Sequence, residues 1–231
     1  MGQSPLAFGT IMNESTTDKL IIPLHVNALP VGVSLHEYQD QASIYSGIEP
    51  AHCVWIVEQG YIKLHRVSGQ GRQATLSLLG RGAVFGSIER RTSTLVEVAS
   101  AQGDARAFRI GVDAFDRLLF GNPEFSRFFA LSLSRRRDAL QRRLFYVMHR
   151  KVESRLAAVL YDLVQGEGEH CTHGGDVDVR LTQQDLADLV GASRQIVSST
   201  LNRFRERRIV EYSRDFICVG DMSALASLAE N

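Results

Sequence analysis

Lysine is nearly absent from this sequence, and so is any net charge. The 231-residue chain has 26 basic and 26 acidic residues, and only three of the basic ones are lysines: Lys19, Lys63 and Lys151. A net charge of zero excludes a polycation that coats nucleic acid or anionic lipid over its whole surface, although a local basic patch remains compatible with it. The other 23 basic side chains are arginines, which bind phosphate and carboxylate groups through two hydrogen bonds at once.

Paired cysteines, long apolar runs and a leader segment are also missing. Cys53, Cys171 and Cys218 are odd in number and far apart, which excludes a disulfide scaffold and favours a reducing compartment. No apolar run approaches the roughly 18 residues that a membrane-spanning helix needs. The first residues lack a basic segment followed by an apolar one. We therefore expect a cytoplasmic globular protein with no membrane partner.

Residues 29–110 have the pattern of short β-strands. Runs rich in valine, isoleucine and leucine, such as 54–57, 61–67 and 74–79, alternate with glycine-containing turns. Strands at a spacing of roughly ten residues favour an antiparallel barrel or roll.

Helical patterns begin near residue 112. A short helix is predicted over 113–119, and a second over 123–149, where Pro123 suits the first turn. The second helix has an apolar seam, with one polar exception at Arg136, formed by Phe129, Leu133, Leu140, Leu144 and Val147. At about 1.5 Å per residue it is roughly 40 Å long, more than one roll covers. We expect it to pair with a second copy of the chain; the alternative is a core helix of its own domain.

The remaining third of the chain has a different organisation. A helix over 151–165, a polar glycine-rich loop over 166–175 and a short strand over 177–181 precede the segment with the strongest functional signal. We place the domain boundary near Arg150. It divides the chain into a sensor unit with the dimer helix, residues 1–150, and a second unit, residues 151–231.

Residues 181–219 predict two short helices followed by a hairpin. Thr182 is a natural N-cap with Asp185 in a capping-box position, and Gly191 allows a sharp turn before Ser193 caps a second helix. The inner face of the first helix is expected to hold Leu186, Leu189 and Val190, and that of the second Ile196, Val197, Thr200, Leu201 and Phe204. Two helices joined by such a turn form a helix-turn-helix, and the hairpin over 209–219 makes it a winged helix.

The outer face of the second helix carries residue types that read DNA. Arginine can bond guanine bidentately and glutamine can bond adenine, so Arg194 and Gln195 are the candidates for base readout. Residues 194–214 contain six arginines and two acids, a local charge of +4, although residues 150–231 are net −3. The predicted DNA-contacting residues are Thr182, Gln183, Ser193, Arg194, Gln195, Ser198, Ser199 and Asn202. We expect double-stranded DNA as the partner.

Residues from about 30 to 220 resemble the catabolite activator/fumarate-nitrate regulator family of bacterial transcription factors. The resemblance is carried by residues 80–86, Asn122-Pro123, Arg155-Leu156-Ala157 and residues 181–195. It implies an α+β fold with an N-terminal antiparallel β-roll of the cupin-like, cyclic-nucleotide-binding type, a long dimerisation helix and a C-terminal winged helix-turn-helix. It further implies a homodimer on a pseudo-palindromic site, with RNA polymerase as a candidate partner.

The sensor half departs from the members of this family that bind cyclic nucleotides. Those members have Phe-Gly-Glu where Ser87 follows Phe85-Gly86 here, and Leu140 and Gln141 stand where an adenine-contacting Thr-Ser pair would be. We therefore expect an effector other than cAMP. A parallel with the family's nitrogen regulators, which bind 2-oxoglutarate, makes a dicarboxylate one candidate, but Ser93 and Gln141 stand where that branch has a loop arginine and a helix glutamate. A regulator without a small ligand is the alternative. The candidate effector pocket comprises Phe85, Gly86, Ser87, Arg136, Leu140 and Gln141.

Metal, cofactor and enzyme functions are weaker interpretations. His170, Cys171 and His173 offer donors suited to zinc, but only three of them in a glycine-rich loop, so we expect no metal and no cofactor. Phosphate-loop, metalloprotease and nucleophile-elbow motifs are absent from the sequence, which indicates binding rather than catalysis. A scaffold or effector-binding protein with no role on DNA is the rival class.

Overall fold

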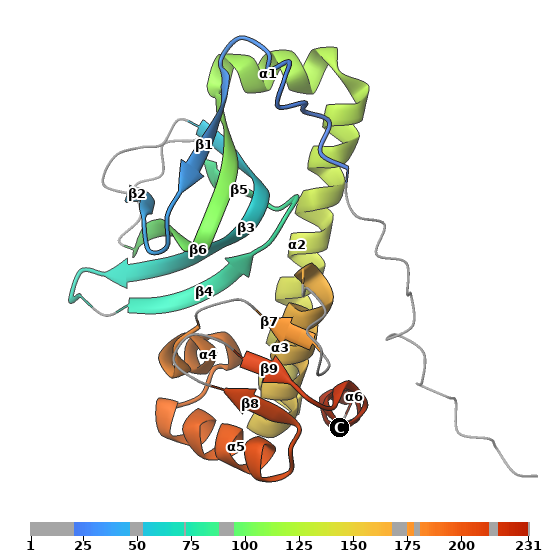
Figure 1. The fold of residues 1–231 in the computed structure, drawn as a ribbon. Helices are drawn as coiled ribbons and strands as arrows, with labels where there is room; N and C mark the ends of the chain where they lie inside the picture. The colour runs from blue at the N-terminus through green and yellow to red at the C-terminus, as the bar shows by residue number, and fades with distance from the viewer. Residues whose placement is uncertain are drawn as a thin grey trace, which may run out of the picture.

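The computed structural model describes residues 21–46, 53–71, 73–87, 95–167, 175–177, 181–212 and 217–230. Within this part of the chain, an antiparallel sheet lies at one end and a smaller unit of helices and strands at the other, and a long helix runs alongside the sheet to the smaller unit (Figure 1). The candidate zinc ligands and the tip of the expected wing lie outside the described residues. The fold is the α+β arrangement that the sequence predicts.

The N-terminal unit is a β-roll of six strands. They are β1 (Val33–Tyr38), β2 (Ser43–Ser46), β3 (Cys53–Ser68), β4 (Gln73–Leu79), β5 (Val84–Ser87) and β6 (Leu95–Gly111). The order is β1-β6-β3-β4, β2 also pairs with β6, β5 also pairs with β3, and every pairing is antiparallel.

Strand β3 joins two strands that the sequence pattern separates. The segments 54–57 and 61–67 form one continuous strand, and its pairing register with β6 shifts between Val57 and Tyr61. Gly60 lies at this shift with φ +74°, and a Cβ there would lie 2.3 Å from the carbonyl oxygen of Asp104. The glycine thus marks a bend within a strand, because only glycine adopts that backbone so close to its neighbour.

Two helices follow the roll, and both are where the sequence predicts them. Helix α1 (Val112–Gly121) packs onto the roll, and α2 (Pro123–His149) continues beyond it. The side chain of Asn122 accepts a hydrogen bond from the Phe125 amide at 3.1 Å, which caps α2. Phe115 contacts Phe125 and Phe129 edge to face, so the first turns of α2 are anchored in the core of the roll.

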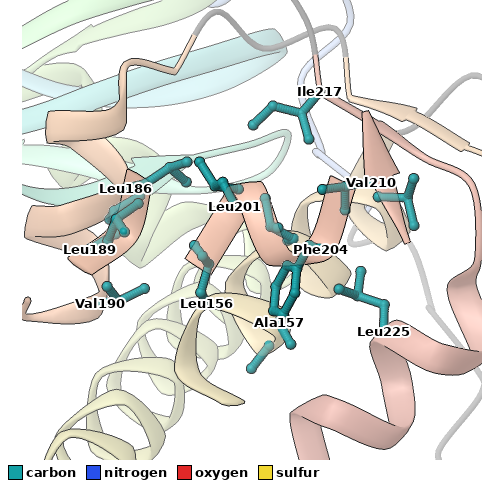
Figure 2. Packing of buried hydrophobic residues seen from close by; sticks show 14 of the residues in the cluster. Leu156, Ala157, Leu186, Leu189, Val190, Leu201, Phe204, Val210, Ile217 and Leu225 are labelled. Atoms are coloured by element: carbon teal, nitrogen blue, oxygen red, sulfur yellow. The ribbon is translucent and has the colours of Figure 1, made fainter. Parts of the chain in front are cut away.

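The C-terminal unit is a winged helix. Its elements are α3 (Val152–Glu167), β7 (Gly175–Val177), α4 (Gln183–Val190), α5 (Arg194–Glu206), β8 (Val210–Tyr212), β9 (Ile217–Val219) and α6 (Met222–Glu230). Figure 2 shows Phe204, Leu201 and Leu156 packed together between α3, α4 and the hairpin. Of the strand expected over 177–181, Val177 is the last residue of β7. Residues 178–180 lie outside the described part of the chain.

Helix α6 was not predicted from the sequence. Its residues Leu225 and Ala229 are buried in the core of the winged helix. Asp221 caps it, because its carboxylate accepts a hydrogen bond from the Ala224 amide at 2.9 Å. The aspartate before an alanine- and leucine-rich segment is a start signal that could have been recognised.

The two units touch where α4 lies beneath β4 (Figure 1). The Thr75 hydroxyl donates to Asp185 at 2.8 Å, the Thr75 amide donates to Asp188 at 2.8 Å, and the ammonium of Lys63 lies 3.3 Å from Asp185. Arg143 of α2 donates to the carbonyl oxygens of Leu76 in β4 and Asp188 in α4, the latter at 2.6 Å. These contacts hold the first helix of the helix-turn-helix against the roll.

Candidate nucleic-acid interface

Hydrogen bonds at the helix ends set the geometry of the helix-turn-helix. Thr182 accepts a hydrogen bond from the Asp185 amide at 3.1 Å, and the Asp185 carboxylate accepts one from the Thr182 amide, also at 3.1 Å. Gly191 ends α4 in the left-handed conformation, with φ +64°, and the Ser193 side chain accepts from the Ile196 amide at 3.4 Å. The predicted caps and turn are confirmed.

The inner faces of both helices agree with the sequence prediction except at Ile196. Val197, Leu201 and Phe204 are completely buried, whereas the side chain of Ile196 is 48% exposed. The prediction that Ile196 faces inward is wrong, because the core of α5 is filled by Val197 and the residues three, four and seven positions after it. Ile196 therefore places an apolar group on the outer face beside Gln195.

The outer face of α5 forms an open groove of about 560 Å³. It is lined by Gln183, Arg194, Gln195, Ser198, Ser199, Asn202, Arg203 and Glu206. Six of the eight predicted DNA-contacting residues are thus brought together on one surface. The other two, Thr182 and Ser193, are exposed at the starts of α4 and α5, where their side chains also accept the capping hydrogen bonds.

Two groups of contacts in this region were not foreseen from the sequence. Arg203 and Arg207 lie 3.7 and 3.5 Å from the carboxylate of Glu153 on α3. The Tyr212 hydroxyl donates to Asn202 at 3.2 Å, and the Arg205 guanidinium lies over the Tyr212 ring. The local charge of +4 is therefore partly compensated by α3. No sequence signal identifies this compensation, because Glu153 meets α5 only through tertiary packing.

The predicted effector pocket is divided by the structure. The ring of Phe85 is buried and stacks against Tyr45 and Trp55 inside the roll. Gly86 has φ +87°, and Arg136 donates to the carbonyl oxygen of Val84 at 3.0 Å, so Arg136 reaches back to its own roll.

Of the other predicted members, Leu140 lines the large cavity beside α2 together with Arg136, whereas Ser87 and Gln141 do not line it. Leu140 is 47% exposed on α2. Gln141 is also exposed. Ser87 ends strand β5, where it pairs with Cys53.

The predicted seam of α2 is an exposed apolar stripe over most of its length. Leu133, Leu140, Leu144 and Val147 are between 40% and 62% exposed. Phe129 departs from the stripe, since its ring packs against Phe115 in the core of the roll. The stripe therefore begins at Leu133.

None of the helices in the described ranges is long and apolar enough to cross a membrane. The same residues contain no group of three or more histidine, cysteine, aspartate or glutamate side chains placed to hold a metal ion.

Two protein-family descriptions match the two units of the chain. Residues 35–122 match the cyclic nucleotide-binding domain, and residues 154–228 match the Crp-like helix-turn-helix domain. The gap between these matches, residues 123–153, contains the whole of α2.

Curated relatives cover almost the whole chain. A global nitrogen regulator of Synechococcus elongatus is 25% identical over 219 residues, which are 94% of this chain and 98% of the relative. The HTH-type transcriptional regulator Cmr of Mycobacterium tuberculosis is 27% identical, covering 90% of this chain and 82% of the relative. A CRP-like cAMP-activated global transcriptional regulator of the same organism is 28% identical, covering 81% of this chain and 84% of the relative.

Solved structures share the fold. A CRP family transcriptional regulator from Thermus thermophilus has a TM-score of 0.71 at 20% identity, covering 85% of this chain and 97% of that chain. A CooA mutant from Carboxydothermus hydrogenoformans has a TM-score of 0.67 at 20% identity, covering 86% of this chain and 88% of the other.

Proposed function

This chain belongs to the CRP/FNR family of DNA-binding transcription regulators, and from that premise we propose that it acts as a homodimer on a pseudo-palindromic DNA site. Residues 1–150 serve sensing and dimerisation, and residues 151–231 bind DNA. Each protomer inserts the N-terminal part of α5 into the major groove, so that the two half-sites lie about one helical turn apart.

The groove on the outer face of α5 is the observation that carries this proposal. It gathers Arg194 and Gln195, which can read bases, beside Ser198, Ser199 and Asn202, which can bond bases or phosphates. No acidic side chain lies in the first turn of α5, so its N-terminus is free to approach a phosphate.

Selection of bound sequences from a random duplex pool, followed by fluorescence anisotropy on the selected site, tests this function. Arg194→Ala and Gln195→Ala should each weaken specific binding by about 10- to 100-fold, since a bidentate base contact is worth roughly 1–3 kcal/mol. Binding to unrelated DNA should change much less. Arg127→Ala, an exposed arginine on α2, is the matched control. Specific binding that survives the double substitution would contradict the proposal.

The exposed stripe on α2 supports the homodimer. Four apolar side chains along one face of a long helix expose area that a second copy can bury. Their spacing matches the seam of a two-stranded coiled coil. Self-association of two protomers through α2 would bring their two α5 helices together as a pair.

Three further parts of the proposal follow from its role on DNA. The chain acts by binding rather than by catalysis, it works in the cytoplasm where bacterial DNA lies, and RNA polymerase is a candidate partner.

Any effector in the roll is not cAMP, because Ser87 replaces the glutamate of the cyclic-nucleotide binders and the Phe85 ring is enclosed by other aromatic rings. A regulator of the same fold that needs no ligand is the alternative.

A further inference from the structure

Ile196 is an apolar residue on α5 whose exposure the packing of the winged helix does not explain. Its side chain is 48% exposed, and it lies outside the core that Val197, Leu201 and Phe204 fill. Among the residues after 150 whose side chains the structure describes, it is the one large hydrophobic side chain that is exposed. Folding of its own chain therefore leaves about half of this side chain uncovered.

The position of Ile196 on α5 places it at the flank of the candidate DNA-binding surface. It lies about 100° around the helix axis from Gln195, and Ser199 lies between them. Both of these neighbours line the groove on the outer face. Ile196 is also in the first turn of the helix, which begins at Arg194, and helical side chains lean toward the N-terminus. Its apolar group therefore lies beside the end of α5 that enters the major groove in the proposed arrangement.

Arg203 indicates which part of the DNA this flank would face. It lies two turns after Ile196 and only about 20° away from it around the axis. Arg203 is exposed, and its guanidinium lies 3.7 Å from the Glu153 carboxylate and 3.3 Å from the Thr200 hydroxyl. An arginine on the flank of a helix in the major groove faces the phosphates of one strand. Ile196, nearer the inserted end, would face the base edges beside that strand.

Thymine carries the group that fits an apolar side chain at this place. Every base pair presents hydrogen-bond donors or acceptors in the major groove, and thymine alone adds a methyl group, at C5. That methyl group projects into the groove on the side of the base nearest the backbone of its own strand. Isoleucine has no hydrogen-bonding side-chain atom, and in a helix it has one strongly preferred rotamer, so it loses little conformational freedom on contact.

Two other occupants fit this flank less well. A phosphate group needs a cation or a hydrogen-bond donor, and the side chain of Ile196 is neither. A protein partner needs a contiguous apolar patch, whereas the neighbouring Gln195, Ser199 and Arg203 are polar. A single methyl group is small enough for one isoleucine side chain to cover.

We propose that Ile196 is a specificity-determining residue that recognises the C5 methyl group of one thymine in each half-site. The contact adds to the hydrogen bonds that Arg194 and Gln195 can make with bases. It rests on the proposed function, because it forms only when α5 lies in the major groove. Uracil has the same hydrogen-bonding groups as thymine and lacks only the methyl group, so readout by hydrogen bonds alone would not distinguish the two bases.

Replacing thymine by uracil tests the contact with a change of one methyl group. The duplex is the site selected from the random pool, and each thymine of the half-site is replaced in turn, in both half-sites at once. At one position the affinity measured by fluorescence anisotropy should fall about 15-fold, because burial of one methyl group gives about fourfold per half-site. Equal affinity for every uracil duplex, or a selected half-site without thymine, overturns the proposal and leaves the proposed function standing.

Variants assign the methyl contact to this side chain. Ile196→Ser should bind the thymine and uracil duplexes equally, whereas Ile196→Val keeps a branched apolar side chain and should retain most of the discrimination. Ser198→Ala, on the opposite flank of α5, is the matched control: its affinities for the two duplexes should change together, so that their ratio stays that of the unmodified chain. Each ratio is measured on one preparation, so a loss of folded chain cancels.

The ratio also separates this proposal from the proposed function. Discrimination that is lost in Ile196→Ser and kept in the other two variants supports the role of Ile196. A ratio in Ile196→Ser equal to that of the unmodified chain overturns this role, although specific DNA binding continues. An unmodified chain that selects no sequence from the pool overturns the regulator function, and this proposal with it.

Discussion

Asp185 receives hydrogen bonds from its own helix cap and from the roll at the same time. It is 6% exposed, it closes the capping box with Thr182, and it meets Thr75 and Lys63 across the boundary between the units. Burial acts to raise the pKa of Asp185, but hydrogen bonds from Thr182 and Thr75 and the charge of Lys63 together hold it below its ordinary value. The carboxylate thus stabilises the folded chain in its ionised form.

The pH dependence of stability should report this residue. Because the pKa of Asp185 is lowered in the folded chain, its contribution is complete above the ordinary aspartate pKa of about 3.9 and is lost as the pH falls below it. Asp185→Asn should lower the free energy of unfolding by about 1–3 kcal/mol at neutral pH. Its stability should also change less on acidification. Urea denaturation at a series of pH values measures both effects.

Asp138→Asn is the control for that experiment. Asp138 is exposed on α2 and pairs with its neighbour Arg137 at 2.9 Å. An exposed pair contributes little, so this variant should follow the unmodified chain at every pH. A pH profile of Asp185→Asn that parallels the unmodified chain would contradict the role given to Asp185.

At the scale of elements, helix α2 exposes apolar side chains that the described part of its own chain leaves uncovered. Its first turns are anchored in the roll through Phe125, but Leu144 is 62% exposed. Leu144→Glu should dissociate the dimer, because a charge in an apolar seam is left unpaired and desolvated. Sedimentation equilibrium measures the change. Leu131→Glu, on the opposite face of the same helix, should leave the dimer intact; equal dissociation by both variants would contradict the seam.

Elements with a local signal were predictable from the sequence. Thr182, Gly191 and Ser193 fix the ends of α4 and α5 through contacts within four residues, so pattern alone identified them. The bend of β3 at Gly60 was read as a turn, because a glycine marks both and only pairing with β6 tells them apart. The pattern wrongly predicts that Ile196 faces inward, because this residue lies at the edge of the apolar face, where periodicity does not separate buried from exposed positions.

Tertiary contacts had no such signal. Glu153 meets α5 from another helix, and Asp188 meets Thr75 from 113 residues away in sequence. The arginines that line the large cavity beside α2 lie on α2, on α3 and near β4, so their convergence follows from packing and not from spacing. The fold and most of the α5 surface could therefore be predicted, whereas the joint between the units could not.

For the whole molecule, the distribution of charge matters more than its total. The chain is neutral, and residues 150–231 are net −3, so there is no broad positive field to draw DNA toward the winged helix. Attraction depends on a few arginines near α5, and Glu153 engages two of them, Arg203 and Arg207. We therefore expect Glu153 to limit affinity for unrelated DNA and to leave discrimination to Arg194 and Gln195.

Glu153→Gln should raise the affinity for unrelated DNA. Removing the carboxylate releases Arg203 and Arg207 toward phosphates, and each added phosphate contact steepens the dependence of log affinity on log salt by about 0.9. We expect tighter binding to unrelated duplex at low salt and a slope steeper by about 0.9 to 1.8 units, for one or both arginines engaged. Anisotropy titrations over a range of salt concentrations measure both. Glu124→Gln, which removes an acid from the first turn of α2, should leave the slope unchanged. An unchanged slope in Glu153→Gln would mean that these two arginines do not reach the DNA backbone.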